Sequence, residues 1–284
     1  MSALLGGRVI GICDSPAGLC RRVARILGVD PATAWFDYAG INHLGWLRGV
    51  HVGGDDLLPQ LLAEDDALES FEEGKLFGAQ WVRTLGAVPN EYLYYYYFTR
   101  DAVAAVQSGS SFRGAFLLEQ QRAFYADPSL PSWERTRLER ETTYMAETRD
   151  SERDSCDLDG GGYENVALAL MRAIARGDHT TLILNVRNGS VMPGLPADAV
   201  VEVPCLVDTN GAHPISTAPL DGHELGLTVT LKAVERAVID AARTGDREAA
   251  LRAFAQHPLV DSVTIACQLL DAYVSVHPQL SYLH

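Results

Sequence analysis

A cysteine and an aspartate stand where a short apolar stretch gives way to the start of a helix. Residues 8–12 predict a strand, and Cys13 and Asp14 follow it directly. Ser15 is a preferred N-cap residue and Pro16 is favoured at the first helical position, so we expect a helix to begin there. A helix N-terminus favours anions and lowers the pKa of a nearby thiol. We therefore expect the active centre to be assembled at this junction.

A histidine between two glycines offers a second group of this kind. Asn42 and His43 lie between Gly40 and Gly45 at the end of a predicted strand. The Cys13 sulfur and the His43 imidazole together could hold a divalent metal, although a structural zinc site takes four protein ligands. Two ligands instead suit an open site that substrate oxygens complete. The spacing also allows the simpler interpretation that both are ordinary buried or satisfied side chains.

Other polar side chains have two interpretations each. Asp14 is either a general acid or base, or a carboxylate that favours the helix dipole. A group of tyrosines either forms an aromatic helix face or includes a catalytic base; its members are Tyr92 and Tyr94–Tyr97. A tyrosine is a base only where positive charge or a metal lowers its pKa from about 10. Arg187, close after Asn185, either binds a phosphate in bidentate fashion or pairs with a surface carboxylate.

A few strands and many helices must position these side chains. Alternation, apolar spacing and glycine or proline breaks predict both kinds of element. Strands are expected at 35–41, 46–52, 181–186 and 200–207, and helices at 16–27, 163–176, 225–242, 246–256 and 260–276. The chain reads mostly helical over 56–153, with a helix start at Pro89, a helical excursion over 113–153 and a hinge at 159–162. This pattern indicates one α+β domain over residues 1–284.

The composition excludes some partners. Lys and Arg total 23 against 37 Asp and Glu, and the net charge of −14 argues against nucleic acid and anionic membranes as partners. The five cysteines are scattered and form no C-x-x-C pair, which fits reduced thiols in a cytoplasmic protein. No secretory signal and no apolar run of membrane-spanning length is visible. No G-x-G-x-x-G, Walker-type or G-x-S-x-G motif occurs, so this chain shows no nucleotide-binding fingerprint.

Several motifs resemble a known family. Residues 8–18, 27–31 and 37–48 look like the centre of the family-4 glycoside hydrolases, the NAD- and metal-dependent 6-phospho-glucosidases and their relatives. Residues 89–97 and two later stretches, 185–190 and 201–205, continue the match in the same order. The resemblance implies a fold like the C-terminal domain of lactate dehydrogenases, with a small mixed or antiparallel sheet and many helices. It also implies a homodimer or homotetramer.

The resemblance implies a reaction outside the two-carboxylate mechanism of most glycosidases. NAD⁺ removes hydride from C3 of the sugar, a base takes the C2 proton, the glycosidic bond breaks by elimination, water adds, and hydride returns. A divalent metal, usually Mn²⁺, would be held by Cys13 and His43 and would polarise the C2 and C3 oxygens. Tyr92 is the implied base, with Tyr95 as the alternative, and Asn42 is expected to contact sugar hydroxyls.

The implied substrate is a phosphorylated disaccharide or glucoside, bound by Asn42, Asn185 and Arg187. Residues 37–47 look like the 6-phospho-β-glucosidases, so we favour that activity. Asp14 favours the alternative, a 6-phospho-α-glucosidase, because an aspartate at this position in the family is typical of that type and can serve as an acid toward an axial leaving group.

The resemblance also implies that a nucleotide-binding half is absent. The family begins with a dinucleotide-binding domain, and this chain matches only the portion of the family after that domain. Hydride transfer needs NAD, so we expect the chain alone to be inactive and NAD to bind only when that domain is present. A further alternative is a non-catalytic remnant that binds phospho-sugar or mediates oligomerisation.

Overall fold

The computed structural model describes residues 9–108, 113–144, 162–220 and 222–284, which form an α+β fold. Seven strands within these residues make one sheet in which every paired neighbour is antiparallel. The strands are β1 (Trp35–Ile41), β2 (Leu44–Val52), β3 (Asp55–Asp56), β4 (Val88–Pro89), β5 (Thr180–Arg187), β6 (Val200–Asp208) and β7 (Gly211–Pro214). The expected α+β class, with a small antiparallel sheet and many helices, is confirmed.

Helices surround this sheet. Those before β5 are α1 (Ser15–Leu27), α2 (Leu58–Ala63), α3 (Asp65–Leu68), α4 (Glu72–Phe77), α5 (Ala79–Leu85), the 3₁₀ turn η1 (Glu91–Leu93), α6 (Tyr94–Tyr97), α7 (Thr99–Ser108), α8 (Arg113–Ala126), α9 (Leu130–Thr142) and α11 (Tyr163–Arg176). After β7 come α12 (Gly222–Thr244), α13 (Arg247–Gln256), α14 (Val263–Val276) and η3 (Pro278–Leu280). None of the helices in the described part of the chain has the length and apolar character of a membrane span.

The sheet consists of two hairpins that meet near its centre. Its order is β3-β2-β1-β6-β5, with β4 beside β2 and β7 beside β6. The β1–β2 hairpin is closed by the Ile41–Leu44 pair, which leaves a two-residue turn. β5 pairs with β6 over its whole length. The pair between Gly40 and Glu202 joins the two hairpins, so the end of β1 that carries the turn is also the point where β6 lies against it.

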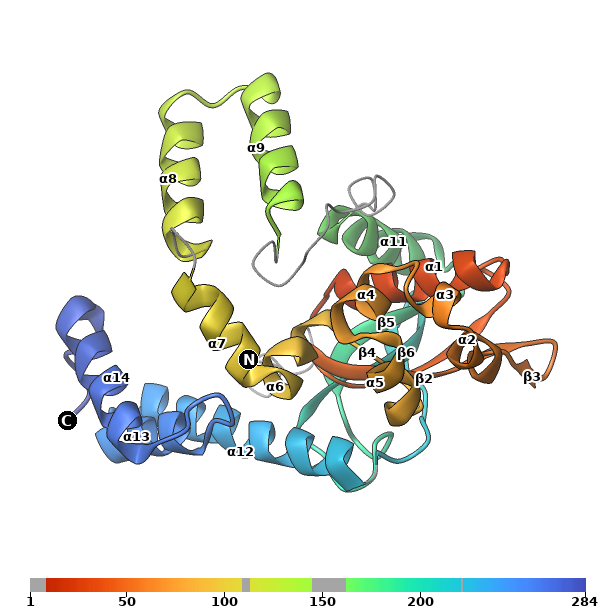
Figure 1. The fold of residues 1–284 in the computed structure, drawn as a ribbon. Helices are drawn as coiled ribbons and strands as arrows, with labels where there is room; N and C mark the ends of the chain where they lie inside the picture. Colours follow the sequence, from red (N-terminus) through yellow and green to blue (C-terminus); the bar gives the residue numbers. More distant parts are fainter. Residues whose placement is uncertain (1–8, 109–112, 145–161, 221) are drawn as a thin grey trace.

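The main core packs on the sheet. α1 contacts β5 and α12 contacts β1, and Figure 1 shows these two helices on opposite sides of the sheet. The largest fully buried side chains are Trp46, Tyr38 and Phe71. A smaller apolar cluster joins the C-terminal helices α12, α13 and α14 through Ala241, Ala249, Ala250 and Leu270. The sheet and the helices on it therefore form the rigid frame on which the chemistry-bearing residues are mounted.

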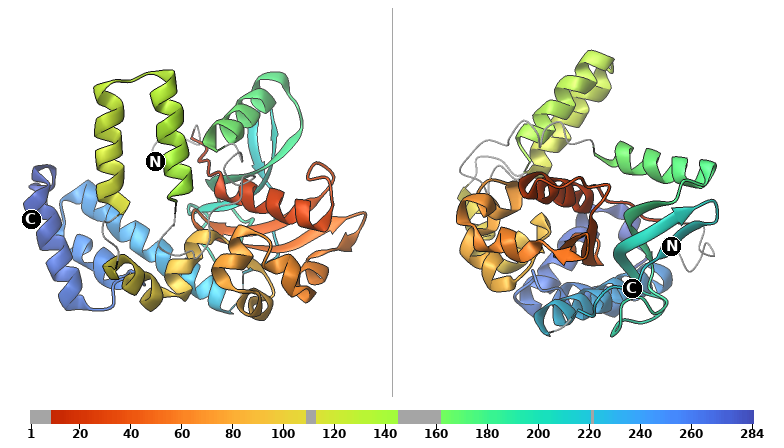
Figure 2. Two further views of the ribbon diagram at one scale, coloured as in Figure 1. Left: turned by 45° about the horizontal axis from the view of Figure 1, so that its top comes forward. Right: turned by 90° about the vertical axis from the view of Figure 1, so that its right-hand side faces the viewer.

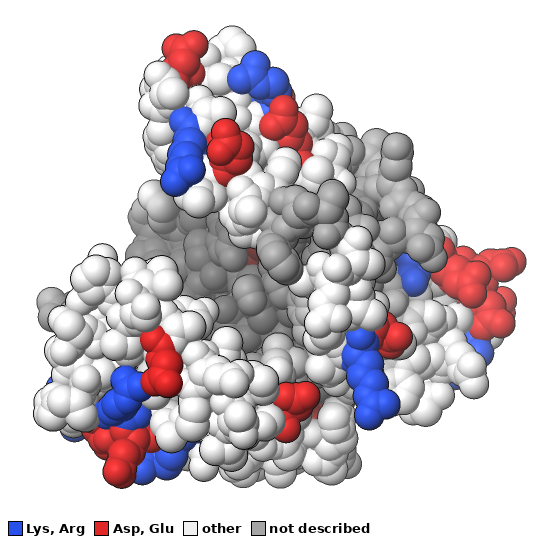
Figure 3. Space-filling view, turned by 60° about the vertical axis from the view of Figure 1, so that its left-hand side comes forward, with Lys and Arg blue, Asp and Glu red and all other residues white. Residues whose placement is uncertain are grey.

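Helices α8 and α9 form a hairpin that projects from the rest of the molecule (Figures 1 and 2). Gln120 Nε2 donates to Glu139 across the hairpin at 2.9 Å, and Ser129 caps α9. Acidic and basic side chains are intermixed on its outer surface (Figure 3). At its base, the Tyr144 hydroxyl donates to Glu91 Oε1 at 2.8 Å. This hairpin occupies the position of the expected helical excursion, whose residues 145–153 lie outside the described residues.

Arg22 of α1 is buried among three glutamates. Its Nε donates to Glu73 Oε2 at 3.0 Å, and its Nη atoms lie 3.7 Å from both Glu72 and Glu91. This cluster ties α1 to α4 and to η1. Burial, together with the charge of Glu73, raises the pKa of Glu91 to about 7, although Arg22 and the hydroxyl of Tyr144 act in the opposite direction. Glu91 is therefore a carboxyl group that titrates near neutral pH inside the core.

Two local predictions near the N-terminus are wrong. Where a strand was expected over residues 8–12, the described part makes a single bridge between Gly11 and Asn185. Ser15, expected to cap the helix, lies inside it, and Asp14 takes the cap position without a side-chain cap hydrogen bond. The Ser15 hydroxyl instead accepts a hydrogen bond from Asn90 Nδ2 at 2.9 Å.

Elsewhere the elements differ from the predictions mainly where strands are very short. β3, β4 and β7 were not expected, and Pro89, predicted to begin a helix, ends β4. A two-residue strand has too few residues to show an alternating pattern. The expected helix at 163–176 and the strand at 35–41 are confirmed to the residue. Of the predicted hinge at 159–162, residues 159–161 lie outside the described residues.

The buried Glu91 gives the fold a specific pH dependence. Its pKa is about 7 in the folded chain against an ordinary value of 4.5, so the folded state keeps a proton that the unfolded state releases. The free energy of unfolding should therefore fall as the pH rises through this window. We expect Glu91→Gln to flatten the fall, because the amide does not titrate. Urea unfolding at a series of pH values between the two pKa values of Glu91 measures how steeply the free energy of unfolding falls.

The matched control for this experiment is Glu69→Gln, at the exposed end of α3. This variant should keep the wild-type slope of unfolding free energy against pH. Equal slopes in the wild type and in Glu91→Gln would contradict the assignment of the effect to Glu91.

Candidate functional site

Cys13 lies buried directly before α1, with 1% of its surface exposed. Its sulfur is 3.3 Å from the Ser15 hydroxyl, and it lies close enough to Tyr163, at the start of α11, to raise the pKa of that phenol. The expectation that the helix N-terminus lowers its pKa is wrong. Burial raises the pKa of the Cys13 thiol, and the charges of Glu202 and Asp14 raise it further, against a smaller lowering by Ser15. Without a bound cation, Cys13 is a neutral thiol.

His43 occupies the turn between β1 and β2 in an unusual backbone conformation. Its φ is +63°, and among the described residues no other residue except glycine has a positive φ. Such a conformation is strained for a side chain with a Cβ, and it is typical of functional positions. The imidazole stacks on the ring of Tyr92, with centroids 3.8 Å apart and planes 16° from parallel. Burial lowers the pKa of His43, so its ring is neutral and can serve as a ligand.

Tyr92 links the histidine to the cysteine. It lies in η1, where its backbone N–H donates to Asn90 Oδ1 at 3.1 Å. Tyr144 packs edge-on against its ring, with centroids 6.3 Å apart. Burial raises the pKa of Tyr92, Tyr144 lowers it by a smaller amount, and the negative charges of Glu91 and Asp14 raise it further. Tyr95, the alternative base, packs edge-on against Tyr94 instead, so the geometry favours Tyr92.

Asp14 faces the start of α11. A Cβ on Gly162 would lie 3.1 Å from Asp14 Oδ2, so the chain approaches the carboxylate closely there. The Asp14 side chain makes no cap hydrogen bond, which leaves its carboxylate available for other work. Its charge also acts on His43 and on Tyr163. His43 and Tyr92 are thus stacked on each other, and the charge of Asp14 acts on both of them.

The predicted substrate-binding residues divide into two groups. Asn185 Nδ2 donates to the buried carboxyl group of Glu202 at 2.8 Å, and the side chain of Asn42 lies close enough to lower the pKa of the same group. Arg187 is exposed at the end of β5, and its Nε donates to the Ala197 carbonyl at 3.2 Å. Its described contacts therefore lie with the loop after β5. Asn188 is buried, and its side chain holds this loop by donating hydrogen bonds to the carbonyls of Met192, Leu195 and Pro196.

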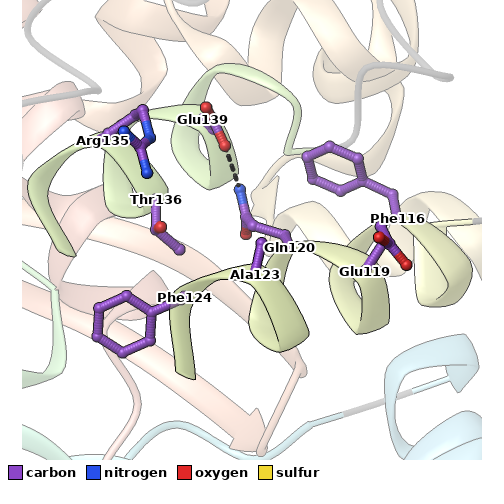
Figure 4. Close-up of a pocket in the computed structure, with 8 residues that line it drawn as sticks. All are labelled: Phe116, Glu119, Gln120, Ala123, Phe124, Arg135, Thr136 and Glu139. Carbon is purple, nitrogen blue, oxygen red and sulfur yellow. Dashed lines mark hydrogen bonds between the residues drawn. The ribbon is translucent and has the colours of Figure 1, made fainter. Parts of the chain in front are cut away.

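A pocket of about 260 Å³ lies elsewhere, between α8 and α9. Figure 4 shows Phe116 and Phe124 toward its two ends and the Gln120–Glu139 hydrogen bond between them. It contains none of the predicted site residues. The chemistry-bearing cluster and this pocket are therefore separate features of the molecule.

The donor set at the cluster suits a divalent cation. Among the described residues, no three His, Cys, Asp or Glu side chains gather as a complete metal cage. One thiol and one neutral imidazole leave coordination positions open for water or substrate oxygens, which is the arrangement of catalytic metal sites. The nearby charges of Asp14 and Glu202, which raise the pKa of Cys13, also favour a cation there. By their donor chemistry Cys13 and His43 suit such an ion, and the metal site that they would form stays a prediction.

Comparison with known proteins agrees with these features. Residues 38–260 match the model of the family 4 glycosyl hydrolase C-terminal domain. The chain belongs to family 4 of the glycosyl hydrolases. The family resemblance expected from the sequence motifs is thereby confirmed, and it covers His43, Tyr92 and Glu202 within the matched residues.

Curated relatives of this family 4 chain act on phosphorylated sugars. A probable 6-phospho-beta-glucosidase of Bacillus subtilis is 28% identical over 281 residues, which cover 95% of this chain and 60% of that protein. The maltose-6'-phosphate glucosidase MalH of Clostridium acetobutylicum is 26% identical over 289 residues, covering 95% and 61%. The chain thus spans about three fifths of the length of the curated relatives it matches.

Solved structures share the fold of this family 4 domain. The 6-phospho-beta glucosidase from Thermotoga maritima, solved with manganese, NAD⁺ and glucose-6-phosphate, has a TM-score of 0.75 at 22% identity, covering 98% of this chain and 61% of that one. A 6-phospho-alpha-glucosidase from gut microorganisms, solved with NAD and Mn²⁺, has a TM-score of 0.72 at 23% identity, covering 96% and 62%. At these identities the likeness shows the fold alone.

Sequence reasoning missed three residues at this family 4 site. Glu202 had a visible signal, since it is a lone acidic residue inside the apolar strand Val200–Val207. Tyr144 and Tyr163 had none. Both reach the cluster from segments far from Tyr92 and Cys13 in the sequence, and only the tertiary fold brings them there.

The strained turn at His43 can be tested by comparing two substitutions that both remove the imidazole. We expect His43→Gly to be more stable than His43→Ala by about 1 kcal/mol, because only alanine keeps a Cβ at φ +63°. Thermal and urea unfolding measure the difference. At Thr181, exposed on β5, the same pair should show the opposite order. Equal stability of the two His43 variants would contradict the strain.

Proposed function

We propose that this chain supplies the metal- and sugar-binding half of a 6-phospho-β-glucosidase that works by NAD-dependent oxidation, elimination, addition and reduction. The stack of His43 on Tyr92, together with the electrostatic effect of Asp14 on both rings, carries the proposal. Relatives named as 6-phospho-glucosidases support it, as does the Thermotoga maritima structure solved with manganese, NAD⁺ and glucose-6-phosphate.

In the proposed mechanism, a divalent ion on Cys13 and His43 would supply Lewis acidity toward the sugar oxygens, and NAD⁺ on a nucleotide-binding domain would supply the hydride acceptor. Tyr92 takes the proton at C2 of the sugar. Burial raises the pKa of Tyr92, so it needs neighbouring positive charge to act as a base, and its stack on His43 sets it beside the proposed cation. Asp14, in its protonated carboxyl form, gives a proton to the oxygen of the leaving group and becomes a carboxylate.

The sugar and its phosphate are held by polar side chains around the cluster. Asn42, exposed in the turn beside His43, contacts sugar hydroxyls. Asn185 lies on the same strand as Arg187, two residues away and therefore on the same face. The Arg187 guanidinium, exposed and held at Nε by the Ala197 carbonyl, is the proposed phosphate contact.

The anomer that the site accepts depends on Asp14. The similarity of residues 37–47 to the β-type enzymes favours 6-phospho-β-glucosides. The 6-phospho-α-glucosidase remains the second candidate, because Asp14 keeps a carboxylate that makes no cap hydrogen bond and can protonate an axial leaving group. Relatives of both kinds match the chain at similar identity.

Assembly and location belong to the same proposal. We propose a homodimer or homotetramer in the cytoplasm. Large apolar side chains exposed on the projecting α9, among them Leu130 and Trp133, support association with other subunits.

The activity is tested with p-nitrophenyl α- and β-glucoside 6-phosphates. A nucleotide-binding domain is supplied together with NAD⁺, Mn²⁺ and a reductant, and nitrophenol release is followed. We expect release from the β-anomer, and no release when the added domain is left out. Faster release from the α-anomer would favour the second candidate. No release from either compound would count against the glycosidase assignment and leave a non-catalytic binding module.

The base is tested by comparing two tyrosine variants. Tyr92→Phe should lower kcat about a hundredfold or more, because the phenolic oxygen is lost. Tyr95→Phe is the matched control and should keep activity close to that of the wild type. Both variants should bind Mn²⁺ as the wild type does, which titration calorimetry measures. The reverse order of activities would move the base to Tyr95.

A further inference from the structure

Glu202 of β6 is a carboxylate with no exposed surface in the middle of the sheet. Its Oε1 accepts a hydrogen bond from Asn185 Nδ2 at 2.8 Å, and its Oε2 accepts from the Tyr38 hydroxyl at 3.1 Å. The side chain of Asn42 lies close enough to lower the pKa of Glu202. The two hydrogen-bond donors thus come from β5 and from β1, and the turn that carries His43 lies beside them. A buried carboxylate needs such partners, because it has lost its hydration.

The hydrogen bonds continue from Tyr38 toward the cysteine. Asn90 Nδ2 lies 3.4 Å from the Tyr38 hydroxyl and donates to Ser15 Oγ at 2.9 Å. Ser15 Oγ is in turn 3.3 Å from the Cys13 sulfur. Gly45 makes room for this path, since a Cβ there would come within 2.4 Å of the Tyr38 hydroxyl. One polar network of buried side chains therefore runs from the β1–β2 turn to Cys13, which is one of the two proposed metal ligands.

The network reaches Cys13 directly, and it reaches His43 and Tyr92 through a neighbouring residue. Asn42 precedes His43, Ser15 contacts Cys13, and Asn90 accepts the backbone N–H of Tyr92. A buried ionised group is a weak source of stability, and apolar side chains of the same volume often do as well or better. What the network does supply is a fixed orientation for the groups bonded to it. Outer partners of this kind set the geometry and affinity of metal ligands.

We propose that Glu202 is a positioning residue that holds the Asn42–His43 turn, so that the imidazole and the Cys13 thiol meet the same divalent cation. This rests on the proposed function, which assigns the cation to Cys13 and His43. Glu202 reaches His43 through Asn42 and reaches Cys13 through Tyr38, Asn90 and Ser15. It acts through these neighbours and does not itself contact the cation.

The test measures Mn²⁺ binding to the 284-residue chain, without nucleotide or sugar. Glu202→Met removes the acceptor oxygens and keeps an unbranched side chain of similar length. We expect it to weaken Mn²⁺ binding by about ten- to a hundredfold. Glu202→Gln should give an intermediate loss, because its amide keeps one acceptor oxygen. Titration with Co²⁺ adds a spectroscopic signature, and we expect a weaker thiolate-to-cobalt absorption at the same metal concentration.

Val207→Ala is the matched control, because Val207 is also fully buried on β6 but lies outside the polar network. It should lower the melting temperature and leave the Mn²⁺ affinity unchanged. A Glu202 variant that lowers the melting temperature but binds Mn²⁺ like the wild type would overturn the proposal and leave Glu202 a purely structural residue.

Two further variants keep the test decisive. If Glu202→Met does not fold, Asn42→Ala cuts the same link from the other side, and it should weaken Mn²⁺ binding. Its effect and that of Glu202→Gln should not add up in the double variant, because both act through one contact. Additive effects would overturn the proposal. Cys13→Ser tests the proposed metal site separately from the proposed role of Glu202. If this variant binds Mn²⁺ as tightly as the wild type, the metal assignment itself fails.

Discussion

The carboxylate of Glu202 sets the arrangement of this domain, because a buried acid must be surrounded by donors. Those donors are side chains of β5 and of β1, and the side chain of Asn42 in the β1–β2 turn lies near enough to lower the pKa of Glu202. Glu202 also lies at the Gly40 pair, where the two hairpins of the sheet join. The donors to Glu202 are therefore in place only when the two hairpins are paired. We infer that this pairing also fixes the turn that carries His43.

A second buried charge cluster supports the same site from the other side. Arg22 ties α1, which begins beside Cys13, to the glutamates of α4 and to Glu91 in η1. Because Glu91 directly precedes Tyr92, the ion pairs of Arg22 hold together α1, which begins beside Cys13, and η1, which contains Tyr92. The thiol and the phenol are thus anchored to each other through the core as well as through the site itself.

Much of this could be predicted from the sequence, and the limits have physical causes. The glycine-bounded Asn42–His43 pair and the helix start after Cys13 carried enough local signal to identify both proposed ligands. The lowered thiol pKa was predicted wrongly, because a helix dipole is visible in a sequence and the burial that outweighs it is not. Tyr144 and Tyr163 were missed because their contacts join segments distant in sequence. The phosphate contact at Arg187 stays a prediction.

The two-residue connection between β1 and β2 leaves no slack in chain length. Strand residues alternate between the two faces of a sheet, so inserting or deleting a single residue between Gly40 and Gly45 would reverse which side chains point toward Glu202. Such an indel would separate imidazole from thiol even though every amino acid was retained. Variation in loop length should therefore be tolerated at the tip of the α8–α9 hairpin. At the β1–β2 turn, the number of residues between Gly40 and Gly45 should stay constant.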